Sequence, residues 1–320
     1  MCRRCESLIK AIDAYIAKKD DDLADTLDNE GYAAAKKSLK AARQIEEEVA
    51  EALMEETDLF LRKINASLDL ETFAKNVWPG VKLTDELAVK LTGIFKERFT
   101  EFMPGIIQVY LQKTDRELTL DSISKVTTGW IDSWSKELGD LMQLTSHEEL
   151  QRILDKGLEN GDDIASFTRA LMDSGIRDEY YRARRVSLTE VLRAHSVAQQ
   201  EAFMQSPVVG GKIWRHSGEY KIEPRANHQA MDGARVPKDE PFELEGADGG
   251  TYYPMYPRDT TLPPGESINC HCLIEPDVNE EVLGLSLEER KALQQQAIDE
   301  MDDEWEKELD AQNRAKAGIE

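Results

Sequence analysis

The chain has 320 residues, 63 of them acidic and 40 basic, and its formal net charge is −23. A surface of this sign repels phosphate groups, which argues against nucleic-acid binding over the whole surface, and no apolar run approaches the ~20 residues that a membrane-spanning helix needs, which argues against a membrane partner. The N-terminus has no apolar signal segment, so we expect a soluble protein of a reducing cytoplasm, whose four cysteines are thiols or metal ligands rather than disulfides.

Residues 1 to about 205 have the pattern of a mainly helical region. One segment places apolar residues at helical spacing with charged residues between them, which predicts a long amphipathic helix. Its apolar positions are Ala42, Ile45, Val49, Leu53, Phe60 and Ile64. A helix of this kind is suited to a bundle or to a coiled-coil seam.

Capping residues mark the expected ends of further helices. Thr84 is expected to cap the helix that follows it, and Ser146 with Glu149 has capping-box spacing ahead of another helix. Gly161 is predicted to end that helix, and the two aspartates after it to begin the next one. A last long helix is expected from about residue 178 to residue 204.

This last helix carries the densest basic cluster of the chain. Its members are Arg177, Arg182, Arg184 and Arg185. A run of this kind is more often a solvated helix face than a binding site, and we interpret it in that way.

The composition changes after residue 207. Residues 208–276 are rich in glycine and proline and contain short apolar pieces, which predicts short strands joined by loops, with a turn at Asp232-Gly233. The predicted fold class is therefore α+β. We expect a long, mainly helical N-terminal region at 1–149, a small α+β module with short strands at 150–276, and an acidic helical tail at 277–320.

Two of the four cysteines stand one residue apart in the stretch INCHC, residues 268–272. If residues 267–274 form a strand, their side chains alternate between two faces. Cys270 and Cys272 then share one face with two isoleucines, and His271 points to the other face. This pattern favours two buried thiols that pack as small apolar groups.

A metal site is the alternative for these two thiols. His228 is the best candidate for a third ligand and His216 the next, because two thiolates with one or two imidazoles suit tetrahedral zinc. Cys2 and Cys5, which form a Cys-x-x-Cys at the N-terminus, offer a four-cysteine site instead. The residues alone leave these interpretations open.

Other catalytic constellations are few. The sequence has no phosphate loop, no Gly-x-Ser-x-Gly and no His-Glu-x-x-His. Thr189, Glu190 and Arg193 lie together on the last long helix and form a candidate polar cluster. In this cluster Glu190 is the candidate general base.

Three stretches in succession resemble a known family. They are RRVSLTEVLRAHSVAQQEAF, then GKIWRHSGEYKIEPRANHQAMDGARVPKDEPFE, then YPRDTTLPPGESINCHCLIEP. Together they resemble the head morphogenesis domain of tailed bacteriophages, the Mu F-like minor head proteins, over about residues 150–276. The residues that match the family pattern are Arg185, Thr189, Glu190, Trp214, Arg225, His228, Asp232, Gly233, Phe242, Asn269, Cys270 and Cys272.

The chain departs from the family pattern at a few positions. His271 stands where the family usually has arginine, and His195 stands where asparagine is common. Some relatives carry a Cys-x-x-Cys at the positions of Arg225 and His228, which would give a fuller metal site. Of that ligand set this chain keeps only His228 and the later pair of cysteines.

The resemblance implies a minor capsid protein of a tailed bacteriophage. Such a protein is carried inside the prohead, associates with the portal, and acts in head assembly and in DNA packaging or ejection. Its partners are then the portal and the capsid or scaffold proteins, with at most transient DNA contact, and its location is the interior of the virion head after assembly in the host cytoplasm. The helical region 1–149 is the part expected to dock on the portal or capsid.

On this reading the protein is not an enzyme and needs no cofactor. The matching residues of the module then mainly hold its loops together, with Trp214 and Phe242 in the core. The alternative is a zinc-dependent hydrolase or nuclease. In that case His228, Cys270 and Cys272 bind the metal, and Glu190 serves as general base.

Overall fold

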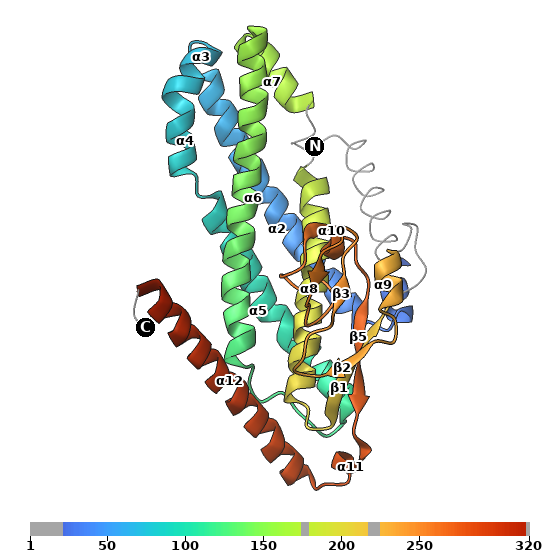
Figure 1. Ribbon diagram of the computed structural model, residues 1–320. Helices are drawn as coiled ribbons and strands as arrows, with labels where there is room; N and C mark the ends of the chain where they lie inside the picture. The colour runs from blue at the N-terminus through green and yellow to red at the C-terminus, as the bar shows by residue number, and fades with distance from the viewer. Residues whose placement is uncertain (1–21, 174–178, 217–224, 318–320) are drawn as a thin grey trace, which may run out of the picture. The chain divides into compact units, whose positions relative to one another are not determined.

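The computed structural model describes residues 22–173, 179–216 and 225–317 of the chain (Figure 1). Residues 22–29 are helical. The long helices are α2 (Ala35–Asn65), α5 (Leu87–Thr114), α6 (Lys125–Asn160), α8 (Glu179–Gln205) and α12 (Leu287–Ala317). Shorter helical elements are α3 (Leu70–Thr72), the π-helical turn η1 (Phe73–Val77), α4 (Trp78–Thr84), α7 (Ile164–Asp173), α9 (Ala226–Ala230), α10 (Pro264–Ser267) and α11 (Glu280–Leu283).

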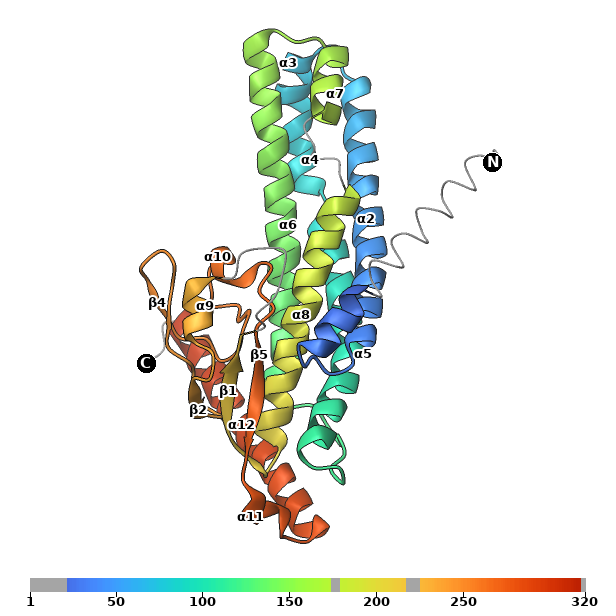
Figure 2. The ribbon, with the colours of Figure 1, turned by 90° about the vertical axis from the view of Figure 1, so that its right-hand side faces the viewer.

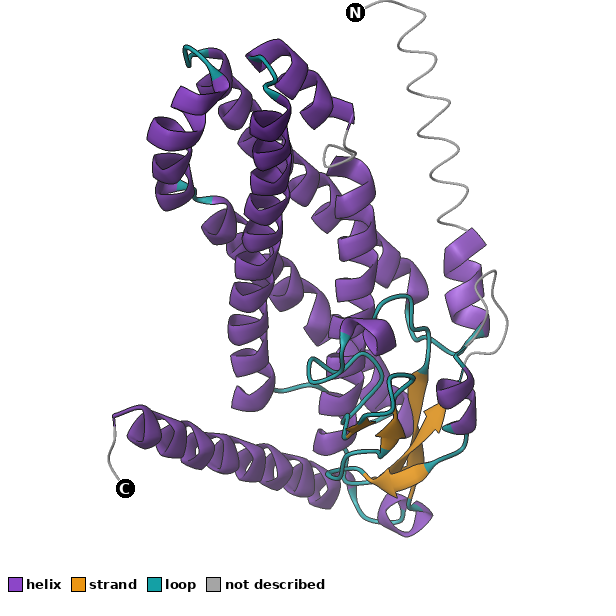
Figure 3. Cartoon of the chain, turned by 45° about the horizontal axis from the view of Figure 1, so that its top comes forward, coloured by secondary structure: helices purple, strands orange, loops and turns teal. Residues whose placement is uncertain are grey.

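The strands are short and lie in the C-terminal half of the chain, which confirms the predicted α+β class (Figure 3). They are β1 (Val209–Arg215), β2 (Arg235–Pro237), β3 (Leu244–Glu245), β4 (Thr251–Tyr252) and β5 (Leu273–Val278). β2, β1 and β5 form an antiparallel sheet in that order, and β3 pairs with β4. The central strand β1 thus has neighbours on both sides.

The chain divides into two compact units, and each is discontinuous in sequence. The first unit contains residues up to 41, 101–129 and 189 onward, and the second contains 42–100 and 130–188. The whole sheet belongs to the first unit. The expected domains at 1–149, 150–276 and 277–320 stay a prediction.

The second unit has an apolar core that the sequence pattern anticipated. All six apolar positions predicted on the long amphipathic helix are at most 3% exposed. Phe60 from α2 packs edge to face on Phe73 and Trp78, with ring centroids 5.4 and 5.2 Å apart. The helical period therefore predicted both the helix and its buried face.

Two of the predicted helix caps are wrong and one is confirmed. Asp85, not Thr84, caps α5, because its Oδ1 accepts the Leu87 N–H at 2.9 Å. Ser146 begins no helix: α6 runs through it, and its side chain is only 2% exposed. Gly161 does end α6, with a positive φ of 71°, and the aspartate at 163 caps α7.

In the first unit, polar side chains of α8 tie this helix to the sheet. Figure 2 shows β1 and β5 beside the C-terminal half of α8. Gln199 donates to the backbone carbonyl of Ile274 in β5, and the Oε1 of Gln200 accepts from Lys212 of β1 at 3.2 Å. These glutamines are almost fully buried, so their hydrogen bonds replace the water that burial removes.

The acidic tail is helical as predicted, and its first half packs within the first unit. Arg290 of α12 is 5% exposed and forms ion pairs with Asp115 and Glu117. Ile298 and Met301 are also buried, whereas residues 307–317 are exposed. Within the described residues, no helix has the length and apolar character needed to cross a membrane.

Candidate functional site

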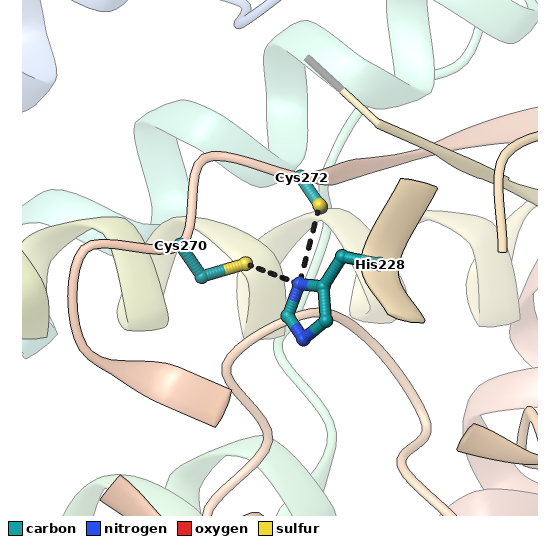
Figure 4. Close-up of side chains that lie close together, drawn as sticks. All are labelled: His228, Cys270 and Cys272. Carbon is teal, nitrogen blue, oxygen red and sulfur yellow. Dashed lines mark hydrogen bonds between the residues drawn. The ribbon is translucent and has the colours of Figure 1, made fainter. Parts of the chain in front are cut away.

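Cys270, Cys272 and His228 form a buried cluster in the first unit. Their side chains are 2–3% exposed. His228 Nδ1 lies 3.5 Å from Cys270 Sγ and 3.6 Å from Cys272 Sγ, and the three atoms all lie within 4.8 Å of one another. Figure 4 shows the lines from both thiols converging on this one ring nitrogen. The structure therefore brings together the three residues that sequence analysis named as metal ligands.

The segment that carries the thiols is a loop, so the strand considered for residues 267–274 forms only from Leu273 onward. α10 ends at Ser267, Asn269 has a left-handed φ of 56°, and β5 begins only at Leu273. Asparagine tolerates this conformation better than most residues, and it breaks the alternation of an extended chain. His271 nevertheless points away from the thiols, as predicted, because its Nδ1 lies 3.7 Å from Glu30 Oε2.

The strand register explains why His216 is near the cluster. Arg215 at the end of β1 pairs with Leu273 at the start of the antiparallel β5. The next residues beyond this pair are His216 and Cys272, and His216 Nδ1 lies 3.5 Å from Cys272 Sγ. The Nε2 of His216 is buried and has no hydrogen-bond partner among the described residues.

His228 is held from its other ring nitrogen by a buried carboxylate. It lies on the short helix α9, within a region where short strands joined by loops were expected, and its Nε2 is 2.8 Å from Glu266 Oε2. Burial raises the pKa of Glu266, but hydrogen bonds from Ala247 and Asn227 outweigh it and leave that pKa below its usual value. An ionised carboxylate only accepts hydrogen bonds, so it fixes the proton on Nε2 and leaves the Nδ1 lone pair facing the thiols.

The two thiols influence each other's ionisation. A hydrogen bond from Cys272 holds the pKa of Cys270 well below its usual value, and the same bond raises the pKa of Cys272. The hydrogen bond between the thiols thus favours the ionised form of Cys270 and the protonated form of Cys272.

The backbone of the thiol loop is fixed by two residues that sequence analysis did not select. Arg258 is 1% exposed, and its Nη1 donates to the carbonyls of Cys270 and Cys272 at 2.6 and 3.0 Å. The Tyr32 hydroxyl donates to the carbonyls of His271 and Cys272 at 2.9 and 3.0 Å. Both Arg258 and Glu266 lie in the last stretch that resembles the family, yet nothing in a single sequence distinguishes a buried arginine from an exposed one.

Trp214 and Phe242, predicted as core residues, form the apolar wall behind His228. Both are completely buried. The Trp214 ring meets the His228 ring edge to face at a centroid distance of 5.9 Å, and it meets Phe242 in the same way at 5.3 Å.

The predicted turn at Asp232-Gly233 is present and lies beside the cluster. Gly233 has a φ of 83°, and its N–H donates to the Trp214 carbonyl at 2.9 Å. Asp232 Oδ1 accepts the His216 N–H at 3.0 Å. Arg225 donates to the Ile268 carbonyl at 2.6 Å and so joins α9 to the segment before the thiol loop.

Among the described residues, the group of clustered ligand atoms does not include the remaining candidates on α8. Glu190 is 5% exposed and accepts from Arg193 Nε at 2.9 Å, while Arg193 donates to the Arg258 carbonyl. Thr189 is half-buried, and Arg185 is exposed and belongs to the second unit.

Several predicted positions lie outside the residues that the structure describes. Cys2 and Cys5, the other half of the four-cysteine alternative, are in this group, and so is Arg177. The side chain of Arg182 is likewise not described.

Two comparisons with known proteins address the module directly. A sequence profile described as Phage Mu protein F like protein matches residues 148–275, which include the whole thiol–imidazole cluster. The chain is also 38% identical over 216 residues to the uncharacterized protein YqbB of Bacillus subtilis (strain 168), over 65% of this chain and 70% of YqbB. This chain belongs to the Mu F-like family.

Membership confirms the resemblance that the three sequence stretches carried, and it indicates a Mu F-like protein of phage head morphogenesis. No solved structure matches the chain significantly.

Proposed function

We propose that this Mu F-like chain is a minor head protein that associates with the portal inside the prohead and acts in head assembly and in DNA packaging or ejection. The observation that carries the proposal is the family match across residues 148–275, whose part in the first unit is a module joined by buried hydrogen bonds around the thiol loop. Inside the virion head, such a module needs stability and a docking surface rather than access for a substrate.

The geometry of the cluster supports an assembly role over the hydrolase alternative. A catalytic zinc keeps an open coordination position for water or substrate, but all three ligand side chains are 2–3% exposed. The alternative also needs Glu190 as a general base, and Glu190 is paired with Arg193. The carboxylate that faces His228 is Glu266, which orients the ring from behind.

The helical region 1–149 is the part that we propose to dock on the portal. Among the described residues, the three most exposed large apolar side chains all lie there: Leu68, Leu83 and Val89 are 92%, 86% and 74% exposed. Exposed apolar side chains of this size contribute to protein–protein contacts when a partner covers them. The net charge of −23 keeps the protein from adhering to the packaged genome, so protein contacts decide its location.

The test is to co-express the chain with the portal protein of the same phage, purify through the portal, and weigh the product by native mass spectrometry. We expect a complex of defined stoichiometry. Leu83→Glu combined with Val89→Glu should weaken it at least tenfold, because each change places a charge at a site that becomes desolvated on binding. Tyr253→Glu, an exposed aromatic outside the helical region at 60% exposure, is the matched control.

Two results would count against the proposal. One is the absence of any complex with portal, capsid or scaffold proteins. The other is tight binding of the purified chain to double-stranded DNA at moderate salt, which would point to nucleic acid as the principal partner.

A further inference from the structure

The distances in the thiol–imidazole cluster match the edges of a zinc coordination tetrahedron. With Zn–S bonds of about 2.3 Å and Zn–N bonds of about 2.0–2.1 Å, a tetrahedral angle separates sulfur from nitrogen by about 3.5–3.6 Å. His228 Nδ1 lies 3.5 and 3.6 Å from the two thiols, and His216 Nδ1 lies 3.5 Å from Cys272 Sγ. The two distances from His228 thus have the lengths that one bound zinc ion requires, and the single distance from His216 to Cys272 has the same length.

We propose that Cys270, Cys272, His228 and His216 bind one Zn²⁺ as a closed, structural site. Two thiolates and two neutral imidazoles are a common donor set for structural zinc. Binding replaces the thiol protons with the metal, so up to two protons are released per ion and no oxidation or reduction occurs. The two thiolates balance the charge of the ion, which leaves the buried site neutral.

The surroundings of His228 are those of a metal ligand. Ligating histidines almost always donate their second ring N–H to a carboxylate or carbonyl, which fixes the tautomer and the ring orientation. Glu266 Oε2 occupies that place at 2.8 Å from Nε2, and the carboxylate is itself held by Asn227 and Ala247. A histidine that only filled space in a core would not need a hydrogen-bonded, almost fully buried carboxylate behind it.

His216 is the proposed fourth ligand because its position directly after β1 places it at the edge of the cluster. Its Nδ1 faces Cys272, and its buried Nε2 has no partner among the described residues. It lies outside the group of three whose ligand atoms are all within 4.8 Å, so coordination requires its ring to move toward the other ligands.

The proposed ion would join three separate elements of the module. His216 follows β1, His228 lies on α9, and the thiols immediately precede β5. Metal ligation is a usual means of holding such short elements in place in small folds. The metal role goes beyond head assembly, because portal binding and metal binding involve different residues.

Metal content and coordination are measured on the full chain, purified reduced and without chelator. We expect one zinc per chain by elemental mass spectrometry. Replacement by Co²⁺ should give intense visible bands typical of tetrahedral coordination and near-ultraviolet thiolate-to-cobalt charge-transfer bands. Cys270→Ser and Cys272→Ser should each lose these bands, whereas His271→Ala, which lies between the two cysteines in sequence but points toward Glu30, should keep them.

Two further variants keep the test decisive if a cysteine variant fails to fold. Glu266→Gln removes the charge behind His228 and should weaken zinc binding about 10–100-fold while one ion still binds at saturation. His216→Ala should change the cobalt spectrum by replacing an imidazole with water.

The proposal is overturned if the reduced wild-type chain binds neither Zn²⁺ nor Co²⁺. It is also overturned if the Cys270→Ser/Cys272→Ser double variant retains as much metal as wild type, which would identify an adventitious ion only. An unchanged cobalt spectrum in His216→Ala would remove His216 as the fourth ligand.

Discussion

Arg258 is the residue whose replacement tests this description of the module most directly. Its guanidinium is 1% exposed and makes four hydrogen bonds, to the carbonyls of Leu192, Cys270 and Cys272 and to the hydroxyl of Ser196, at 2.6–3.1 Å. Arg258→Met keeps much of the side-chain volume and removes every donor. Three buried carbonyls then lose a partner in the same small region.

The expected loss of stability is large. Hydrogen bonds from a charged donor contribute about 1.5–3 kcal/mol each, but neighbouring bonds are not additive, so the sum overstates the effect. Leaving a buried carbonyl without a partner costs about 1–3 kcal/mol. We therefore expect Arg258→Met to lower the unfolding free energy of the module by about 4 kcal/mol. The positive φ of 68° is shared by both side chains and cancels in the comparison.

Hydrogen exchange resolves this loss locally, which matters because a chain with two units need not unfold in one step. Protection of the β5 amides should fall about 1,000-fold, since each 1.4 kcal/mol corresponds to a factor of ten. Arg235→Met is the matched control. Arg235 lies in the sheet that contains β5, but its side chain is 61% exposed and paired with Asp277 at the surface. Its replacement should therefore change the protection of the β5 amides less than tenfold. Equal effects of the two substitutions would refute the assigned role of Arg258.

Two further substitutions test individual features of the module. Burial lowers the pKa of Lys212 from 10.5 to about 7, so between these pH values the folded state binds fewer protons than the unfolded chain and stability rises with pH. Lys212→Met should therefore stabilise the protein most below pH 7. Denaturant titrations should show this gain shrinking as the pH approaches 10.5. Gly233→Ala should lower the free energy of unfolding by about 1–2 kcal/mol, because its φ is 83°, although no atom lies within 4 Å of the added Cβ. Gly265→Ala is the control: its site is equally open and has no positive φ, so thermal unfolding should show no measurable change.

The predictable part of the fold is the part that local chemistry controls. The apolar period of α2 gave the helix and its buried face because side chains three and four residues apart share one side of a helix. The turn at Asp232-Gly233 and the helix end at Gly161 were predicted correctly because glycine adopts the left-handed conformation at little cost. The cap predicted at Ser146 is wrong because a capping pattern is also compatible with a helix interior. The burial of Ser146 within α6 decides in favour of the interior.

The candidate ligand residues of the site could be named from the sequence, but the residues that hold them in place could not. The sequence favoured two buried thiols at Cys270 and Cys272 and kept a metal ligand set with His228 as the alternative, and the structure places the three ligand atoms together. No strand forms around the thiols because Asn269 adopts a left-handed φ that turns the chain. The neighbours of Asn269, rather than its residue type, select this conformation. Glu266 and Arg258 act through contacts that depend on the tertiary fold, so no local pattern identifies them.

The thiol loop is held from two opposite sides, and this arrangement bears on how the zinc site would form. On the carbonyl side, Arg258 and Tyr32 fix the backbone of residues 270–272. On the thiol side, His228 is oriented by Glu266. Three ligands are therefore positioned by hydrogen bonds that do not involve the metal, which reduces the conformational entropy that binding must overcome. If the proposed zinc binds, its binding free energy adds to these hydrogen bonds in stabilising the folded module.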